Sequence, residues 1–290
     1  MASAATTKQN EGYYVPHGSR WPFTAAIGLF LFMVGFGTLL NGISAGPWLM
    51  AAGGAVIIFM LFGWFGTVIA ENLSGLYNAQ VDRTFRWGMT WFIFSEVMFF
   101  GAFFGALFYS RGGAVPALGG ATLTHTYLWP HFAAGWPTNG PGNIGGEFEG
   151  MTAWGVAAIN TAILLTSSWT VTVAHHAIKD AKRGRTVAWL GVTVLLGLSF
   201  LVLQGREYHD AYTHLNMTLH SGIYGSTFFM LTGFHGLHVT LGTIMLITML
   251  VRAARGHFTP DNHFAFEAVS WYWHFVDVVW LCLFVFVYIM

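Results

Sequence analysis

Long apolar stretches separated by short polar segments run along most of the chain. Residues 21–70 contain no Asp, Glu, Lys or Arg, and this run is too long for one membrane crossing, which takes ~20 residues. Turn-forming residues at 41–47 divide it, so the pattern predicts spans at 22–40 and 48–70. It predicts five further spans, at 86–109, 151–174, 186–203, 222–251 and 264–288. We therefore expect an all-α integral membrane protein with seven transmembrane helices.

The composition agrees with a membrane protein and excludes several other classes. Only 8% of the 290 residues are charged and 55% are hydrophobic, a mixture that cannot coat a soluble globule. The formal net charge is zero and no large basic cluster is present, which argues against a nucleic-acid partner. The lone Cys282 excludes disulfide frameworks, cysteine-based zinc sites, iron–sulfur clusters and c-type haem.

The positive charges indicate the orientation. If the amino terminus is cytoplasmic, ten Lys and Arg side chains lie on that side, and only Arg111 and Arg206 lie outside. The residues before Trp21 lack the apolar core and cleavage site of a secretory signal peptide. We expect a cytoplasmic segment at 1–20, a helix pair at 21–70, a cytoplasmic linker at 71–85 and five helices at 86–290. The external loop at 111–150 should form an ordered cap, since it carries little charge.

Glu96 is the one acidic residue in the third predicted span. It lies about nine residues, or roughly 14 Å, inside that span at helical rise, so its carboxyl group should be protonated or partnered. It can carry protons, contact lipid or a neighbouring helix, or act as a neutral hydrogen-bond donor that locks two helices. We favour the lock, because an isolated buried acid without a charged neighbour is a poor proton relay.

Histidines near mid-membrane raise the alternative of a haem protein. His235, His238 and His274 are the candidates for axial ligands, since a b-type haem is often held by histidines on facing helices. His175 and His176 are adjacent and point about 100° apart on a helix, so they do not easily bind one metal ion together. Spacing alone leaves the haem alternative open, beside that of a proton-coupled transporter, for which no internal repeat is visible.

His274 and Asp277 form an i, i+3 pair deep in the seventh span. An imidazole and a carboxyl group on one helix face can satisfy each other, which makes two costly groups tolerable in a bilayer. We expect a structural pair rather than a cofactor site, because the surrounding tryptophans are typical of helix packing.

The cytoplasmic helix ends offer a phospholipid site. Trp64 and Glu71 lie seven residues apart on nearly one face of the second span, and Arg252 closes the sixth. An arginine matches a phosphate, a tryptophan suits the head-group boundary, and a carboxylate accepts from an ethanolamine. Ordinary interfacial anchoring is the alternative. His238 lies about 21 Å from Arg252 at helical rise, so the two cannot hold one head group.

Two long segments closely resemble subunit III of haem–copper cytochrome c oxidase. They are FFMLTGFHGLHV at 228–239 and FEAVSWYWHFVDVVW at 266–280, and shorter matches follow in the same order from Trp21 onward. The resemblance implies a two-helix bundle and a five-helix bundle with a lipid-holding cleft between them. Because the first two helices are present, it favours the cytochrome c branch, and the Gly-rich loops look bacterial.

The resemblance implies a supporting subunit without a catalytic centre, redox cofactor or metal of its own. Haem and copper would lie in subunits I and II, which oxidise cytochrome c, reduce oxygen and pump protons. The chain would stabilise subunit I, hold phospholipid and support proton uptake. It would lie in a bacterial inner membrane, with its amino terminus cytoplasmic and its carboxyl terminus periplasmic.

The resemblance also assigns residues. Glu96 matches the family's buried reactive glutamate. Glu71, His238 and Arg252 match residues implicated in lipid contacts, and the family also has a counterpart of Trp64. The chain departs from the family where Phe65 replaces a second tryptophan and where residues 76–78 replace a His-containing loop. Ser221 stands where an aspartate is usual, and Thr138 where a second proline is usual.

Overall fold

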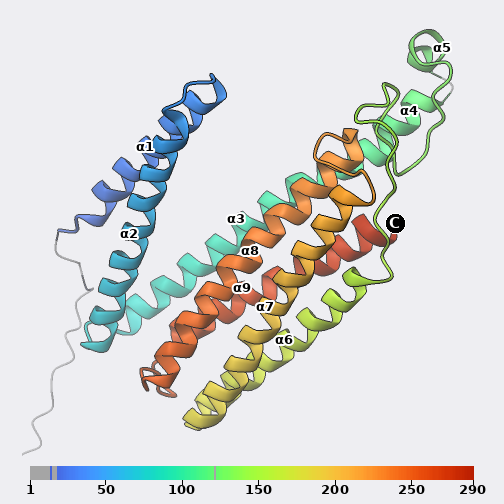
Figure 1. The fold of residues 1–290 in the computed structure, drawn as a ribbon. Coiled ribbons are helices and arrows are strands. Elements are labelled where there is room, and N and C mark those ends of the chain that lie inside the picture. The colour runs from blue at the N-terminus through green and yellow to red at the C-terminus, as the bar shows by residue number, and fades with distance from the viewer. Residues whose placement is uncertain (1–13, 15–17, 121) are drawn as a thin grey trace, which may run out of the picture. The chain divides into compact units, whose positions relative to one another are not determined.

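The fold is described from a computed structural model that covers Tyr14, residues 18–120 and residues 122–290. Among these residues, seven helices are long and apolar enough to cross a membrane, which confirms the predicted all-α class (Figure 1). The chain divides into two compact units, 1–87 and 88–290. Most of the cytoplasmic segment expected at 1–20, with Lys8, lies outside the described residues.

The first unit is a helical hairpin. Helix α1 spans Trp21–Leu40 and α2 spans Gly46–Leu73. Each has a proline in its first turn, where the missing N–H costs no hydrogen bond. The predicted spans at 22–40 and 48–70 correspond to these helices, and α1 packs along α2.

Glycines bring the backbones of α1 and α2 into contact. A Cβ atom placed on Gly35 would lie 2.5 Å from the backbone N of Met50, and one on Gly53 would lie 2.4 Å from that of Phe32. No side chain fits at either point, so the two backbones touch. Small residues with this role are typical of helix pairs in lipid.

The second unit contains the remaining spans. Helix α3 begins in the first unit and continues into the second, and a π-helical turn joins it to the short α4. The bounds are α3 Ala79–Tyr109, the π-helical turn Ser110–Ala114, α4 Val115–Gly119, α5 Leu123–Leu128, α6 Val156–Lys179, α7 Arg183–Thr213, α8 Gly222–Ala254, α9 Phe264–Leu283 and a terminal π-helical segment Phe284–Ile289. Helix α7 extends ten residues beyond the predicted span at 186–203, because polar residues there are buried within the bundle.

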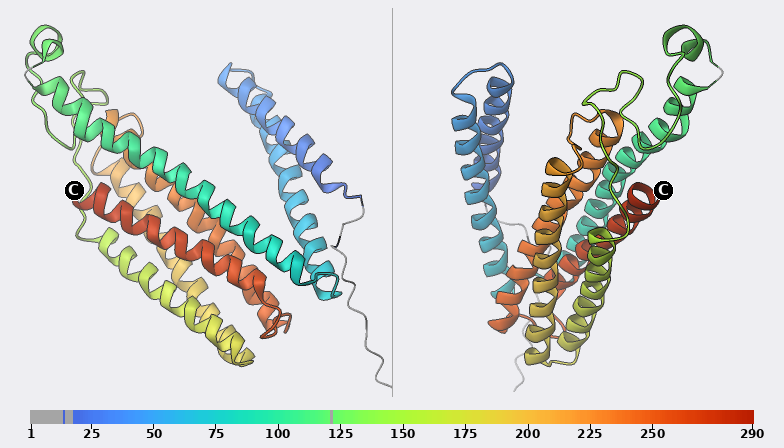
Figure 2. Two further views of the ribbon diagram at one scale, coloured as in Figure 1. Left: turned by 180° about the vertical axis from the view of Figure 1, so that it is seen from behind. Right: turned by 45° about the vertical axis from the view of Figure 1, so that its right-hand side comes forward.

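The core of the second unit lies among α6, α7, α8 and α9 (Figure 2). Helix α6 packs on α7 and α9, α7 packs on α8, and α8 packs on α9. The fully buried rings of Phe200, Trp273 and Trp280 fill the space between them. Because lipid tails provide no hydrophobic force between helices, tight packing of this kind holds the bundle together.

The segment 111–150 is folded onto the start of α8. It contains α4 and α5, and the rings of Trp136 and Phe148 lie 5.6 and 5.5 Å from that of Tyr224. Gly222 opens α8 with φ +62°, and a Cβ atom there would lie 2.3 Å from the carbonyl oxygen of Asn139. Only glycine therefore fits where this cap meets α8.

Candidate functional site

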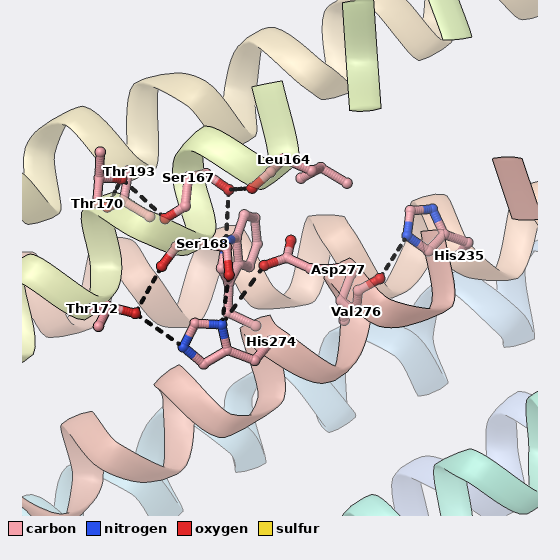
Figure 3. A network of polar contacts seen from close by, with 11 residues as sticks. Leu164, Ser167, Ser168, Thr170, Thr172, Thr193, His235, His274, Val276 and Asp277 are labelled. Atoms are coloured by element: carbon pink, nitrogen blue, oxygen red, sulfur yellow. Dashed lines mark hydrogen bonds and ion pairs between the residues drawn. The ribbon is translucent and has the colours of Figure 1, made fainter. Parts of the chain in front are cut away.

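Polar side chains in the second unit gather around His274 of α9 (Figure 3). Ser168 Oγ of α6 lies 2.8 Å from His274 Nδ1, and Thr172 Oγ1, one turn later, lies 3.4 Å from Nε2. The Thr172 hydroxyl also donates to the backbone carbonyl of Ser168 at 2.9 Å. The imidazole is thus held between two hydroxyl groups of the neighbouring helix.

Asp277 lies on the same face of α9 as His274, but their contact is loose. Its Oδ2 is 3.9 Å from His274 Nδ1, which is too long for a hydrogen bond. The two groups lie near each other without a hydrogen bond between them, and their role as a structural pair stays a prediction. The hydrogen bonds of His274 go instead to α6, because Ser168 and Thr172 approach closer than Asp277 does.

Two buried tryptophans of α9 are anchored to α6 in the same way. Trp273 Nε1 donates to Ser167 Oγ at 3.0 Å, and Trp280 Nε1 donates to Thr161 Oγ1 at 2.9 Å. His235 connects α8 to α9, because its Nε2 donates to the backbone carbonyl of Val276 at 3.3 Å. Small hydroxyl groups on α6 thus satisfy the N–H groups that burial of large rings would otherwise leave unpaired.

Glu96 and His238 are brought together from α3 and α8. Glu96 Oε2 lies 2.9 Å from His238 Nε2, and the His238 side chain is 10% exposed. His238 Nδ1 donates to the Phe234 carbonyl at 2.6 Å, which fixes the tautomer of a neutral imidazole with Nε2 as the acceptor. Glu96 therefore has a partner that spacing alone did not reveal.

Glu207 of α7 is a further buried carboxyl group, and it is not among the site residues that the sequence predicts. Gln204 Nε2 donates to Glu207 Oε2 at 2.9 Å, and the hydroxyl group of Tyr288 donates to the same oxygen at 3.0 Å. The i, i+3 spacing of Gln204 and Glu207 was the available signal. The predicted span at 186–203 ends before both residues, so this signal lies outside it.

At the end of α2, Glu71 is held by tyrosines. Tyr77 donates its hydroxyl hydrogen to Glu71 Oε2 at 2.7 Å, and Tyr14 donates to Oε1 at 3.2 Å. Burial, together with the hydrogen bond and charge of Glu71, raises the pKa of Tyr77 well above its ordinary value, so Tyr77 remains a neutral donor. Trp64 stacks on Phe65 with ring centroids 5.7 Å apart and is 47% exposed.

Arg252, at the end of α8, is a buried cation. Only 6% of the residue is exposed, and its guanidinium lies over the ring of Phe258 at 4.7 Å. Its Nε has no hydrogen-bond partner within the described chain. A buried guanidinium with an unused donor is suited to an anionic group supplied from outside the chain.

Known proteins similar to the chain agree on one family. The family profile of Cytochrome c oxidase subunit III matches residues 11–290. The chain is 40% identical to "Cytochrome c oxidase subunit 3" of Gadus morhua over 283 residues, which is 97% of this chain and 98% of that protein. It is also 40% identical to the protein of the same name from Arabidopsis thaliana over 281 residues, 97% of each chain.

Proposed function

Because the chain belongs to the cytochrome c oxidase subunit III family, we propose that it serves its complex as a scaffold. In this proposal it stabilises subunit I, holds phospholipid and supports proton uptake. The family carries no redox cofactor, and we place haem and copper in subunits I and II. Those partners then transfer electrons from cytochrome c to oxygen.

One observation carries the scaffold proposal. The mid-membrane histidines His235, His238 and His274 were the candidate haem ligands, and five of their six ring nitrogens lie within hydrogen-bonding distance of groups in the second unit. The exception, His235 Nδ1, is buried without a partner. Imidazoles committed in this way connect helices to each other, which favours a structural role over ligation of a haem.

The Glu96–His238 contact is the central helix lock in this proposal. It joins α3 to α8 through two mostly buried side chains, with exposed fractions of 20% for Glu96 and 10% for His238. His238 was also expected at a lipid head group, and a lipid contact would require this hydrogen bond to break. We therefore assign His238 to the lock.

Lipid contacts remain assigned to Trp64 and Glu71 in the first unit and to Arg252 in the second. Trp64 exposes half of its surface, and its indole suits the head-group boundary. Arg252 offers a buried donor without a partner, which a lipid phosphate can satisfy. Glu71 is oriented by its two tyrosines, and its carboxylate can still accept from an amino head group.

Arg252→Ala tests the lipid assignment. The complex carrying this variant should retain less phospholipid by mass spectrometry and should lose activity sooner during turnover. Arg255→Ala is the matched control, because Arg255 is a neighbouring but exposed arginine. Unchanged lipid content in Arg252→Ala would remove Arg252 from the site.

We propose that the chain lies in a bacterial inner membrane with its amino terminus cytoplasmic and its carboxyl terminus periplasmic. The ten-to-two distribution of Lys and Arg supports this orientation. An alkaline phosphatase fused to the carboxyl terminus should be active, since that enzyme matures outside the cytoplasm. An inactive fusion of normal abundance would reverse the orientation.

The scaffold proposal is tested by removing the chain from the purified complex. The remaining subunits should begin turnover at nearly the normal rate, take up protons more slowly and inactivate sooner. Adding the chain back should restore the catalytic lifetime. If the stripped complex matches the intact one in lifetime and proton uptake, the supporting role is wrong.

A further inference from the structure

Three metal-binding side chains meet where α6 ends and α9 begins. His175 lies near the end of α6, His263 immediately precedes α9, and Glu267 lies in the first turn of α9. One ligand atom from each lies within 4.8 Å of the others, and among the described residues this is the one group of three such side chains. All three side chains are mostly buried, with exposed fractions of 19%, 10% and 13%.

The distances to the carboxylate fit a tetrahedral ion. Zinc binds imidazole nitrogen and carboxylate oxygen at about 2.0–2.2 Å, so two ligand atoms of a tetrahedral site lie roughly 3.3–3.5 Å apart. Glu267 Oε1 is 3.5 Å from His175 Nε2 and 3.1 Å from His263 Nε2. Both separations are close to the edge of such a tetrahedron, and a nitrogen of one imidazole lies within 4.8 Å of a nitrogen of the other.

The orientation of the imidazoles also suits an ion. His175 Nε2 and His263 Nε2 are buried, and neither makes a hydrogen bond within the described chain, although the carboxylate is near. The other nitrogen of His263, Nδ1, lies 3.1 Å from the Thr259 carbonyl. A hydrogen bond from Nδ1 to a backbone carbonyl is the usual way to present Nε2 of a histidine ligand to a metal.

We propose that His175, His263 and Glu267 form a zinc site that ties the end of α6 to the start of α9. Two imidazoles and one carboxylate are ligands that Zn²⁺ accepts, and water completes the fourth position. The ion would be structural, because it joins two helices of one unit. This inference does not rest on the proposed function, since it concerns side chains within this chain alone.

A hydrogen-bonded cluster without a metal is the competing interpretation. In such a cluster each buried Nε2 should donate to, or accept from, a well-aligned partner. Here two buried nitrogens face a common carboxylate without forming that bond. A shared cation satisfies both nitrogens at once, whereas rotation of one ring satisfies only one of them.

The test uses the assembled complex and Zn²⁺ alone as the probe. After treatment with a chelator, the complex is equilibrated with zinc, and its zinc content is measured by mass spectrometry. Wild type should bind one more equivalent of zinc than the complex from which this chain has been stripped. His263→Ala and Glu267→Gln should lose that equivalent or bind it at least about tenfold more weakly.

His176→Ala is the matched control, because His176 is adjacent to His175 but exposed and outside the cluster. It should bind zinc as wild type does. Substituted Co²⁺ should show the visible absorption of a four-coordinate ion in wild type and His176→Ala, and lose it in His263→Ala.

Two results would overturn the zinc site. One is the absence of an extra equivalent in wild type, a measurement that needs no variant to fold. The other is equal zinc binding by wild type and Glu267→Gln, a variant that preserves the size of the side chain. Co-purification with the partner subunits is scored separately, so a failed scaffold proposal and a failed zinc site give different results.

Discussion

In the first unit, α1 and α2 meet backbone to backbone at glycines, whereas the helices of the second unit meet through buried rings and hydrogen-bonded side chains. Gly53 lies against the backbone of Phe32, while Trp273 of α9 reaches Ser167 of α6. Both solutions suit a bilayer, where burial of apolar surface does not drive helices together. The hairpin of the first unit depends on glycines, which have no side chain at the contact points. The second unit depends on side chains that pack and form hydrogen bonds.

The largest effect is expected from Gly53→Ala. Its Cβ would lie 2.4 Å from the backbone N of Phe32, and a backbone cannot move aside as a side chain can. We expect a loss of about 1–3 kcal/mol or more in the free energy of unfolding. The measurement is equilibrium unfolding of the purified chain in mixed micelles.

The matched control for this prediction is Gly54→Ala. No atom lies within 4 Å of a Cβ placed at Gly54, so the substitution should be neutral or stabilise the helix by about 0.5–1 kcal/mol. Equal destabilisation by Gly53→Ala and Gly54→Ala would show that backbone contact does not hold the hairpin.

Gly242→Ala sharpens the comparison within the second unit. Its Cβ would lie 2.8 Å from Cε3 of Trp273, a side-chain atom rather than backbone, so we expect a loss toward the lower end of about 1–3 kcal/mol. Trp273→Phe should recover part of this loss because it removes ring atoms at the contact. Strictly additive effects of Gly242→Ala and Trp273→Phe would contradict that mechanism.

The Glu96–His238 contact should contribute less to the free energy of unfolding than the glycine contacts do. Glu96→Leu leaves His238 Nε2 without its partner and should cost about 1–2 kcal/mol. Glu96→Gln should stay close to wild type in stability and oxidase turnover, because the amide can donate the same hydrogen bond. A double-mutant cycle with His238→Leu measures the coupling.

The same variants test whether Glu96 carries protons. If the complex with Glu96→Gln assembles normally but its proton pumping falls tenfold or more, then Glu96 is a proton carrier and the helix-lock assignment is wrong. Normal pumping by Glu96→Gln, together with a measurable coupling to His238, is the result expected of a lock.

Ser168→Ala should have the smallest effect. It removes one of two hydroxyl groups at His274, and hydrogen bonds between membrane helices average about 0.6 kcal/mol. Thr166→Ala on the exposed face of α6 is the control and should change stability less. A larger loss in Ser168→Ala than in Glu96→Leu would reverse the order proposed for the polar contacts.

Span positions were predictable from the sequence, while polar partners mostly were not. Apolar runs located every membrane-crossing helix, because the bilayer imposes a length on each of them. The predicted fifth span ends too early, because Glu207 and its neighbours are polar and the partner of Glu207, Tyr288, lies 81 residues away. The contact of Glu96 with His238 could not be predicted for the same reason, because the two residues are 142 positions apart in the sequence.

Local spacing predicted proximity better than bonding. The i, i+3 rule placed His274 beside Asp277, but it carried no information on Ser168, which comes from another helix and lies closer to the imidazole. Similarly, spacing in the sequence relates His175 only to its neighbour His176, whereas its partners in the proposed zinc site come from the start of α9. The packing of the helices determines which side chains form hydrogen bonds with a buried polar group. Patterns within a single sequence do not reveal that packing.

The central claim is that this chain supports the complex without holding a redox centre. The most direct test is to isolate the complex in mild detergent, record its optical spectrum and then strip this chain away. We predict that all haem absorbance remains with the partner subunits. Haem that stays with the stripped chain would contradict the account and make His235, His238 and His274 ligand candidates again.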